Sequence, residues 1–348
     1  MRIVVNDIAA STGGAMTVLR DFYAAVCAGD KENEWIFLLN DRYFEETDNV
    51  KIRTLSEIKR SGVKKLLFDF FTGKRYIESL APDVVLSLQN IITFGVKAPQ
   101  LVYIHQSIPF QRVKKFSFFC KRERKLAVIQ YLIGGIIKLS AQKSDCVIVQ
   151  TKWMKDAVCR MCRLPEEKVI TSLPTVNPVE TSDTVPFDRT AFFYPTASAI
   201  YKNNACIRKA SEMLNEKGIA HTVTLTLPPE QSAESILCTG RLPYEQVLEY
   251  YRKSTLVFPS YIETFGYPLA EARQTGTIVL AADTPFAREV LDGYENAYFF
   301  DPFRPAELAR LMEQVTIEEI VKKDIAPDNK TASQGWETVL EQVLRRKV

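Results

Sequence analysis

Short, continuous apolar runs recur along both halves of the chain, and they constrain its fold more than any other feature. Each run is a few residues long and is followed by a polar loop and then an amphipathic stretch. Continuous apolar runs are typical of parallel strands that are covered on both faces. The pattern therefore predicts an α/β protein with doubly wound, Rossmann-like sheets. The predicted strands are 3–7, 35–39, 84–88, 101–104 and 145–151 in the first half, and 191–194, 221–227, 255–258, 277–281 and 297–300 in the second.

The length of 348 residues exceeds that of one ordinary domain and predicts two. A segment rich in Pro, Ser, Thr and Asp, residues 173–188, is the predicted linker. It divides an N-terminal domain, 1–172, from a C-terminal domain, 189–332. The last segment places Trp336, Val339, Leu340 and Val343 at helical spacing, which predicts an amphipathic helix over 333–344.

The composition is that of a globular protein, with 46% hydrophobic and 25% charged residues. The longest apolar run, 131–137, is shorter than the roughly 20 residues that a bilayer-spanning helix needs. The chain begins directly with a predicted strand and shows no signal-peptide pattern. Its seven cysteines, an odd number, suggest reduced thiols, and we expect a cytoplasmic location. The single C-x-x-C pair, Cys159 and Cys162, has no second pair or nearby His and is interpreted as a coincidence.

A net charge of +3 conceals an asymmetry between the two halves. Residues 1–170 hold 27 basic and 18 acidic residues, whereas 171–348 hold 18 and 24. Seven basic residues in 111–125 interleave with Phe116, Phe118 and Phe119. Such a segment suits an anionic membrane surface, and a solvated helix face is the alternative. No nucleic-acid motif accompanies the segment, so nucleic acid is not an expected partner.

Two features of the N-terminal half lie where ligands bind in doubly wound sheets, at the carboxyl ends of strands. His105 directly follows the strand 101–104, and either a site role or a structural role fits it. Gly13 and Gly14 follow the first strand, but the dinucleotide fingerprint G-x-G-x-x-G is absent. These glycines would let backbone approach a ligand or the other domain closely, or they form a plain turn.

The stretch 255–271 predicts a buried strand, a polar loop and a helix that opens near Pro268. Glu263 precedes this helix, and Glu271 is expected inside its first turn. The free N–H groups between the two carboxylates suit a phosphate or an oxygen-rich ligand. This combination predicts a site for a nucleotide sugar.

The same stretch carries a family resemblance. The sequence P-S-Y-I-E-T-F-G-Y-P-L-A-E-A at 259–272 resembles the P-S-x-x-E-x-F-G-x-P-x-x-E-A signature of retaining GT-B glycosyltransferases, specifically family four, also called glycosyl transferases group 1. T-G-R-L-P-Y-E at 239–245, R-E-V at 288–290 and F-D-P at 300–302 also fit. The resemblance implies two Rossmann-like domains that face each other across a cleft. It also implies that the C-terminal segment, 333–348, completes the N-terminal, acceptor-side domain.

The resemblance assigns roles to particular residues in the donor domain. Glu271 would bind the ribose hydroxyls, and Glu263 would contact the donor sugar. Lys202 would neutralise the diphosphate as it leaves. Backbone N–H groups of Thr264, Phe265 and Gly266 would bind sugar and phosphate. His105 would lie near the donor sugar, and Gly13 and Gly14 near the phosphates or the acceptor.

One position departs from the family pattern. An arginine usually stands five residues before the phosphate-binding lysine, and here that position is Ala197. Either another cation such as Arg241 replaces this arginine, or Lys202 and helix N-termini stabilise the diphosphate by themselves.

The resemblance therefore predicts an enzyme that uses no metal ion or cofactor. It would transfer a sugar from a UDP- or GDP-sugar to a glycan or lipid-linked acceptor with retention, in bacterial polysaccharide synthesis such as that of lipopolysaccharide or capsule. The protein would be cytoplasmic, or peripheral on the inner face of the membrane. The alternatives are a non-catalytic nucleotide-sugar-binding protein and an epimerase or phosphorylase-like enzyme on the same fold.

Overall fold

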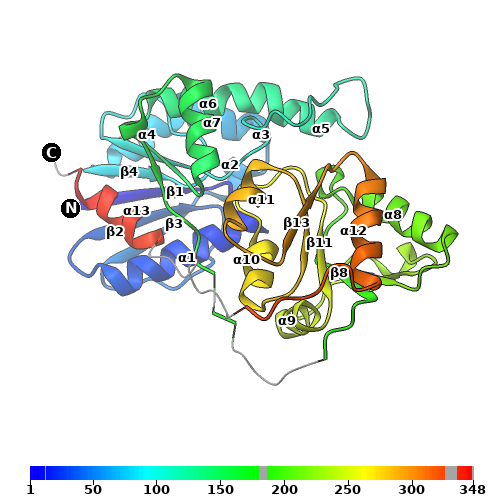
Figure 1. The fold of residues 1–348 in the computed structure, drawn as a ribbon. Helices are drawn as coiled ribbons and strands as arrows, with labels where there is room; N and C mark the ends of the chain where they lie inside the picture. Colours follow the sequence, from blue (N-terminus) through cyan, green and yellow to red (C-terminus); the bar gives the residue numbers. More distant parts are fainter. Residues whose placement is uncertain (12, 177, 180–185, 326–334, 347–348) are drawn as a thin grey trace. The chain divides into compact units, whose positions relative to one another are not determined.

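The computed structural model describes residues 1–11, 13–176, 178–179, 186–325 and 335–346. The chain folds as two compact units, residues 1–175 with 334–348 and residues 176–333. Each unit is built on one parallel sheet whose strands are connected by helices (Figure 1). The predicted α/β class with two doubly wound sheets is thereby confirmed.

Seven strands form the sheet of the first unit, in the order β3-β2-β1-β4-β5-β6-β7. Both faces of this sheet are buried: Ile3 and Val5 belong to one core, and Val4 belongs to another. This two-sided burial explains why the central strands are continuously apolar. The strands are β1 (Arg2–Asp7), β2 (Glu34–Leu39), β3 (Val50–Thr54), β4 (Val84–Ser87), β5 (Gln100–Ile104), β6 (Cys146–Val149) and β7 (Val169–Thr171).

The C-terminal helix α13 packs on helix α1 of the first unit. The ring of Trp336 lies 5.3 Å from the rings of both Phe22 and Tyr103, measured between centroids. The predicted apolar face of α13 is therefore buried. The helical segments of this unit are α1 (Gly14–Gly29), α2 (Ser56–Lys59), α3 (Gly62–Leu67), the π-helical turn η1 (Phe68–Thr72), α4 (Gly73–Ser79), α5 (Arg124–Ala127), the π-helical turn η2 (Val128–Ile133), α6 (Gly134–Lys143), α7 (Lys152–Cys162), the 3-10 turn η3 (Glu166–Lys168) and α13 (Gly335–Leu344).

Six strands form the sheet of the second unit, in the order β10-β9-β8-β11-β12-β13. Helix α8 packs on α12, and α10 packs on α9 and α11. The strands are β8 (Ala191–Tyr194), β9 (Thr222–Leu225), β10 (Ile236–Cys238), β11 (Thr255–Phe258), β12 (Val279–Ala282) and β13 (Ala297–Phe300). The helical segments are α8 (Asn204–Glu216), α9 (Tyr244–Lys253), α10 (Tyr267–Gln274), α11 (Pro285–Val290), α12 (Pro305–Thr316) and the 3-10 turns η4 (Ile200–Lys202) and η5 (Pro229–Gln231).

Three strands, β3, β7 and β10, were not predicted from the sequence. All three are edge strands of their sheets. An edge strand has one neighbour and less covering, so it does not need a continuous apolar run. The exposed residues of V-K-I-R-T in β3 show this directly.

The basic aromatic segment 111–125 is not a helix along most of its length, because α5 begins only at Arg124. Phe116 is buried at 3% exposure, whereas Phe119 is 95% exposed. Lys114 forms an ion pair of 2.6 Å with Glu123 that closes the loop. The alternative of a solvated helix face is therefore wrong for this segment.

Parts of two predicted segments lie outside the described residues. These are 177 and 180–185 in the predicted linker, and 333–334 and 347–348 in the C-terminal segment. Within the described part of 173–188, the N–H of the buried Val179 donates a hydrogen bond of 2.8 Å to Gln274 Oε1. No helix among the described residues is long and apolar enough to cross a membrane.

Candidate active site

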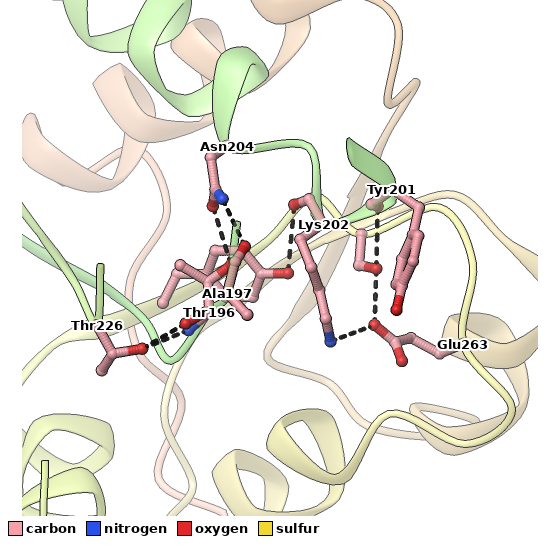
Figure 2. Close-up of polar contacts among 9 residues, drawn as sticks. Thr196, Ala197, Tyr201, Lys202, Asn204, Thr226 and Glu263 are labelled. Carbon is pink, nitrogen blue, oxygen red and sulfur yellow. Dashed lines mark hydrogen bonds and ion pairs between the residues drawn. The ribbon is translucent and has the colours of Figure 1, made fainter. Parts of the chain in front are cut away.

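An ion pair between Lys202 and Glu263 lies at the carboxyl ends of β8 and β11. Lys202 ends the short turn η4, and its Nζ lies 2.6 Å from Glu263 Oε1. The two side chains point toward each other in Figure 2. They are only 21% and 18% exposed, so the charges are partly withdrawn from water. Lys202 is therefore not a solvated loop lysine.

The backbone holds this pair in place from both sides. Asn203 adopts a left-handed conformation with φ 58°, and its Nδ2 donates to the carbonyls of Pro302 at 2.7 Å and Pro259 at 3.3 Å. These bonds tie the loops that follow β8, β11 and β13 to one another. The hydroxyl of Ser260 donates to Glu263 Oε1 at 2.7 Å. The carboxylate is thus oriented before any ligand binds.

Glu271, the second predicted carboxylate, is held by tyrosines rather than by cations. Tyr251, which is fully buried on α9, donates its hydroxyl to Glu271 Oε2 at 3.0 Å. Burial raises the pKa of the Glu271 carboxyl, and hydrogen bonds from Tyr251 and Tyr244 partly offset this rise. The carboxylate has about four acceptor positions, so these two tyrosines leave it able to accept from a ligand hydroxyl as well.

The sequence had predicted Glu271 in the first turn of its helix, and this prediction is wrong. Helix α10 begins at Tyr267, and its first turn contains no acidic residue. The N-terminus comes one residue before Pro268 because Gly266 takes up a left-handed conformation as the N-cap. Glu271 is therefore not placed to interact with the helix dipole, since that effect is confined to the first turn.

The loop between the two carboxylates leads into this N-terminus. Thr264 is half-buried, and Phe265 is buried with its ring 5.4 Å from the ring of Tyr267. Gly266 has φ 89°, a conformation that L side chains rarely adopt. A Cβ at Gly266 would lie 3.3 Å from Leu269 Cδ1. Glycine is thus favoured here by its backbone conformation, and a side chain would also press against Leu269.

We expect Gly266→Ala to destabilise the second unit by about 1–2 kcal/mol, because alanine resists the left-handed region. Gly293→Ala isolates the backbone effect, since Gly293 has φ 68° but open space around its Cβ position. Gly135→Ala, in α6 and also in open space, should be neutral or slightly stabilising. In calorimetric unfolding, Gly266→Ala should lose the most stability, Gly293→Ala less, and Gly135→Ala none. Equal stability of Gly266→Ala and Gly293→Ala would contradict the role of the Leu269 contact.

Ala197 lies exposed on a loop that is firmly anchored. The Thr196 N–H donates to Thr226 Oγ1 at 2.7 Å, and Asn204 Nδ2 donates to the Ala197 carbonyl at 2.9 Å (Figure 2). Arg241, the suggested substitute cation, is exposed on the loop after β10, two strands away from β8 in the sheet order. The structure therefore does not bring Arg241 into contact with the Lys202–Glu263 pair.

His105, in the first unit, is held at the end of β5 by Asn90. Asn90 Oδ1 accepts from the backbone N–H groups of His105 at 2.8 Å and Gln106 at 2.9 Å, so its Nδ2 faces His105 Nε2 at 3.0 Å. Because an amide nitrogen can only donate, Nε2 must accept, and the proton of the neutral ring lies on Nδ1. Burial lowers the pKa of His105 to about 4, so the ring is neutral near pH 7.

The Nδ1 atom of His105 is buried and has no hydrogen-bond partner in the described part of the chain. A buried N–H group without a partner is costly, and a ligand hydroxyl could satisfy it. The geometry thus suits His105 as a hydrogen-bond donor and not as an acid, since a ring of such low pKa carries no extra proton at neutral pH.

Gly13 and Gly14 open helix α1. Gly13 is its N-cap, with φ 64°. Nothing lies within 4 Å of a Cβ built on either glycine, so internal packing does not demand them. Both are exposed, which leaves space for a ligand at this turn.

Sequence reasoning missed the residues that orient the candidate site. These residues contact other protein groups instead of a predicted ligand, so no motif spacing identified them. Only Ser260 had a visible signal, because it stands three residues before Glu263 in the P-S-x-x-E pattern. The missed residues are Asn90, Asn203, Tyr244, Tyr251 and Ser260.

Comparison with known proteins supports this part of the chain most strongly. Residues 231–331 match the family model described as glycosyl transferases group 1. A D-inositol 3-phosphate glycosyltransferase from Nocardia farcinica is 38% identical over 90 residues, which are 26% of this chain and 16% of that protein. This chain therefore matches less than a fifth of that relative's length.

Solved structures resemble the whole chain. WaaG, a glycosyltransferase involved in lipopolysaccharide biosynthesis, aligns with a TM-score of 0.68 and 11% identity over 98% of this chain and 99% of WaaG. Anabaena Alr3699/HepE in complex with UDP-glucose aligns with a TM-score of 0.64 and 16% identity, covering 99% and 98% of the two chains. Both units take part in these matches. The chain has the GT-B fold.

Proposed function

We propose that this GT-B protein is a retaining glycosyltransferase that uses a UDP- or GDP-sugar as donor and needs no metal ion. The observation that carries the proposal is the Lys202–Glu263 pair beside the N-terminus of α10, with Glu271 on that helix. One cation, one sugar-facing carboxylate and one buried carboxylate are the groups that a diphosphate, a hexose and a ribose require. The match over 231–331 and the UDP-glucose complex of the neighbour support the same proposal.

In this mechanism Lys202 exchanges one anionic partner for another. Without donor it pairs with Glu263, and with donor it would contact the diphosphate and release Glu263 to the sugar hydroxyls. As the glycosidic bond breaks, negative charge grows on the leaving phosphate, and Lys202 stabilises it in a partly desolvated site. The leaving phosphate would take the proton of the attacking acceptor hydroxyl, which keeps the reaction on one face of the sugar.

The direct test is calorimetric titration with UDP, GDP and their sugars, followed by incubation of the bound donor with lipid-linked and free glycan acceptors. Binding of one nucleotide sugar and formation of an α- or β-linked product with the donor's own anomeric configuration are expected. Inversion in the product would refute retention, and loss of turnover in EDTA would refute metal independence.

A second candidate is a nucleotide-sugar-binding protein without turnover, and Ala197 is the observation that favours it. We expect Ala197→Arg to raise turnover or donor affinity, since the loop is exposed and the new guanidinium would add a second cation near the diphosphate. Ser198→Arg, at the next exposed position, is the matched control. Donor binding without product in the wild type, together with product formation in Ala197→Arg, would establish the second candidate.

The pKa of Glu271 gives the donor site a predicted pH dependence. Only the ionised carboxylate accepts two hydroxyl protons, so affinity should fall as the pH drops through the raised pKa of Glu271. Tyr251→Phe removes a bond that favours the ionised form, and the fall should then begin at higher pH. Tyr250→Phe, at the adjacent position with its ring stacked on Phe193, should keep the wild-type profile. Identical profiles for Tyr251→Phe and the wild type would contradict this account.

We further propose that the acceptor is a glycan or a lipid-linked glycan in bacterial surface polysaccharide synthesis, made at the inner face of the membrane. The basic aromatic segment 111–125 would contact the anionic surface, and Phe119 and exposed Lys115 and Arg122 support this. Neutralising Lys115 and Arg122 should weaken flotation with anionic liposomes. Unchanged flotation would refute the contact.

A further inference from the structure

Four large apolar side chains outside the candidate active site are exposed along one helical run of the first unit. Their exposed fractions are 67% for Val63, 42% for Leu66, 48% for Leu67 and 70% for Phe71. Positions 63, 67 and 71 are spaced by four, so they lie on one side of the run formed by α3 and η1. We refer to these four residues as the apolar stripe.

The stripe is not required for packing within the unit. Phe68 of the same run lies in a buried core together with Ile77 of the following helix α4, and Phe70 stacks on Phe94 with 4.5 Å between ring centroids. The run ends in the π-helical turn η1, which Gly73 follows. A Cβ at Gly73 would lie 2.6 Å from the Phe68 carbonyl oxygen, so a side chain at this position would not fit against the turn. The run is thus apolar on its inward side and on part of its outward side.

Basic residues flank the stripe at both ends. Residues 56–75 hold six basic residues and two acidic ones, Glu57 and Asp69. Asp69 is buried and paired with Lys65, so the two residues together add no net charge at the surface. Exposed Arg60 and Lys64 lie before and within the stripe and share Glu57 as their ion-pair partner, and Lys74 lies beyond it, 4.0 Å from Glu78. Exposed Arg75 leaves the surface of this run with more positive than negative charges. An apolar stripe framed by cations is typical of helices that lie in the plane of an anionic membrane surface.

The stripe is also connected to the helical run that begins at the end of the basic aromatic segment 111–125. The loop after β4 joins the two: the Phe94 N–H donates to the Asp69 carbonyl at 2.7 Å, and the Ile92 N–H donates to Ser140 Oγ on α6 at 3.3 Å. Helix α6 continues the helical run from 124 that carries exposed Leu132, at 61%. Both apolar surfaces therefore attach to one loop at the carboxyl end of β4.

We propose that the apolar stripe is a second membrane-contacting element, whose partner is a bilayer containing anionic lipid. A second copy of the chain fits less well, since a two-fold interface would place this cationic run against itself. The inference extends the proposed function, because a lipid-linked acceptor requires the enzyme at the membrane. It does not depend on donor binding, which belongs to the other unit.

The test is sedimentation of the full chain with phosphatidylcholine vesicles, with and without phosphatidylglycerol. Leu67→Ser with Phe71→Ser should lower the partition onto anionic vesicles by about tenfold or more. Lys64→Gln with Lys74→Gln should lower it less and reduce its salt dependence. Ile317→Ser with Val321→Ser, which are exposed at 53% and 63% in the other unit, is the matched control and should change nothing.

Two further measurements keep the outcomes distinct. Phe71→Trp should be quenched by brominated lipid in anionic vesicles, whereas Val321→Trp should not. Unchanged partition of the stripe variant onto anionic vesicles would overturn the proposal. So would a wild type that self-associates through the stripe, shown by a stripe variant that loses self-association but keeps its partition. Nucleotide titration of the same variants tests the donor site separately. If the wild type binds no nucleotide but loses vesicle binding when the stripe is changed, the proposed function is refuted and the membrane-contact proposal stands.

Discussion

Lys202→Ala is expected to lower turnover by two to three orders of magnitude while the protein stays folded. In the proposed mechanism the ammonium contacts the diphosphate, and losing one preorganised donor of this kind typically costs that much. The variant also removes the cation that is paired with Glu263, which is 18% exposed and keeps its hydrogen bond from Ser260, so donor binding should weaken as well. Steady-state assays with the identified donor, paired with nucleotide titration, separate these two effects.

Lys209→Ala is the matched control, since Lys209 is an exposed lysine on the following helix α8. It should retain wild-type activity. Glu271→Gln completes the set: it should raise the Kd for the nucleotide by about ten- to a hundredfold, because hydrogen bonds to a charged acceptor contribute about 1.5–3 kcal/mol. Wild-type turnover in both Lys202→Ala and Glu271→Gln would refute the assignment of the site to unit two.

Asp7→Asn is expected to stabilise the first unit, and more strongly at pH 8 than at pH 5. Asp7 ends β1 at 1% exposure, and neither of its carboxylate oxygens has a hydrogen-bond partner in the described part of the chain. Burial raises its pKa from 3.8 to about 7. The charges that face it, Lys65 on α3 and Lys59 on α2, offset only part of that cost, and Lys65 is itself paired with Asp69 on η1.

The sign follows from proton binding. Between pH 4 and pH 7 the unfolded chain has released the Asp7 proton and the folded chain still holds it, so stability falls as the pH rises across this window. Above pH 7 the loss is complete and amounts to about 4 kcal/mol for about three pKa units. Asparagine removes this dependence, so the gain over wild type should be about 2–3 kcal/mol larger at pH 8 than at pH 5.

Urea unfolding followed by tryptophan fluorescence measures the stability of the first unit, which contains Asp7. All three tryptophans, Trp35, Trp153 and Trp336, belong to the first unit. Asp48→Asn, at an exposed position, is the control for general charge effects. A pH-independent difference between Asp7→Asn and wild type would show that the buried carboxyl keeps an ordinary pKa.

The α/β class and most central strands could be predicted from the sequence because their cause is local. A strand that is covered on both faces needs a continuous apolar run, and the central strands β8 and β11 begin and end where those runs do. The edge strands β3, β7 and β10 were not predicted, because an edge strand has less covering and does not need a continuous apolar run. Their backbone positions depend on a neighbouring strand and not on their own side chains.

The candidate site divides in the same way. Glu263 and Glu271 could be picked out because a signature of fixed spacing carries them, and Lys202 because of the family resemblance. Their ligand roles remain predictions. Their partners could not, since Tyr251 reaches Glu271 from another helix and Asn203 joins three loops through carbonyl groups. Asn90 likewise determines the tautomer of His105 from 15 residues away.

The sequence by itself determined that residues 255–271 form a strand, a glycine-containing loop and a helix with two carboxylates, because each of those steps depends on neighbours in the chain. Only the tertiary structure decided what the two carboxylates do before a ligand arrives. Glu263 pairs with a lysine that lies 61 residues away, and Glu271 is buried against a tyrosine 20 residues away. Charge pairing and burial act through space, so they make one glutamate an ion-pair partner and raise the pKa of the other.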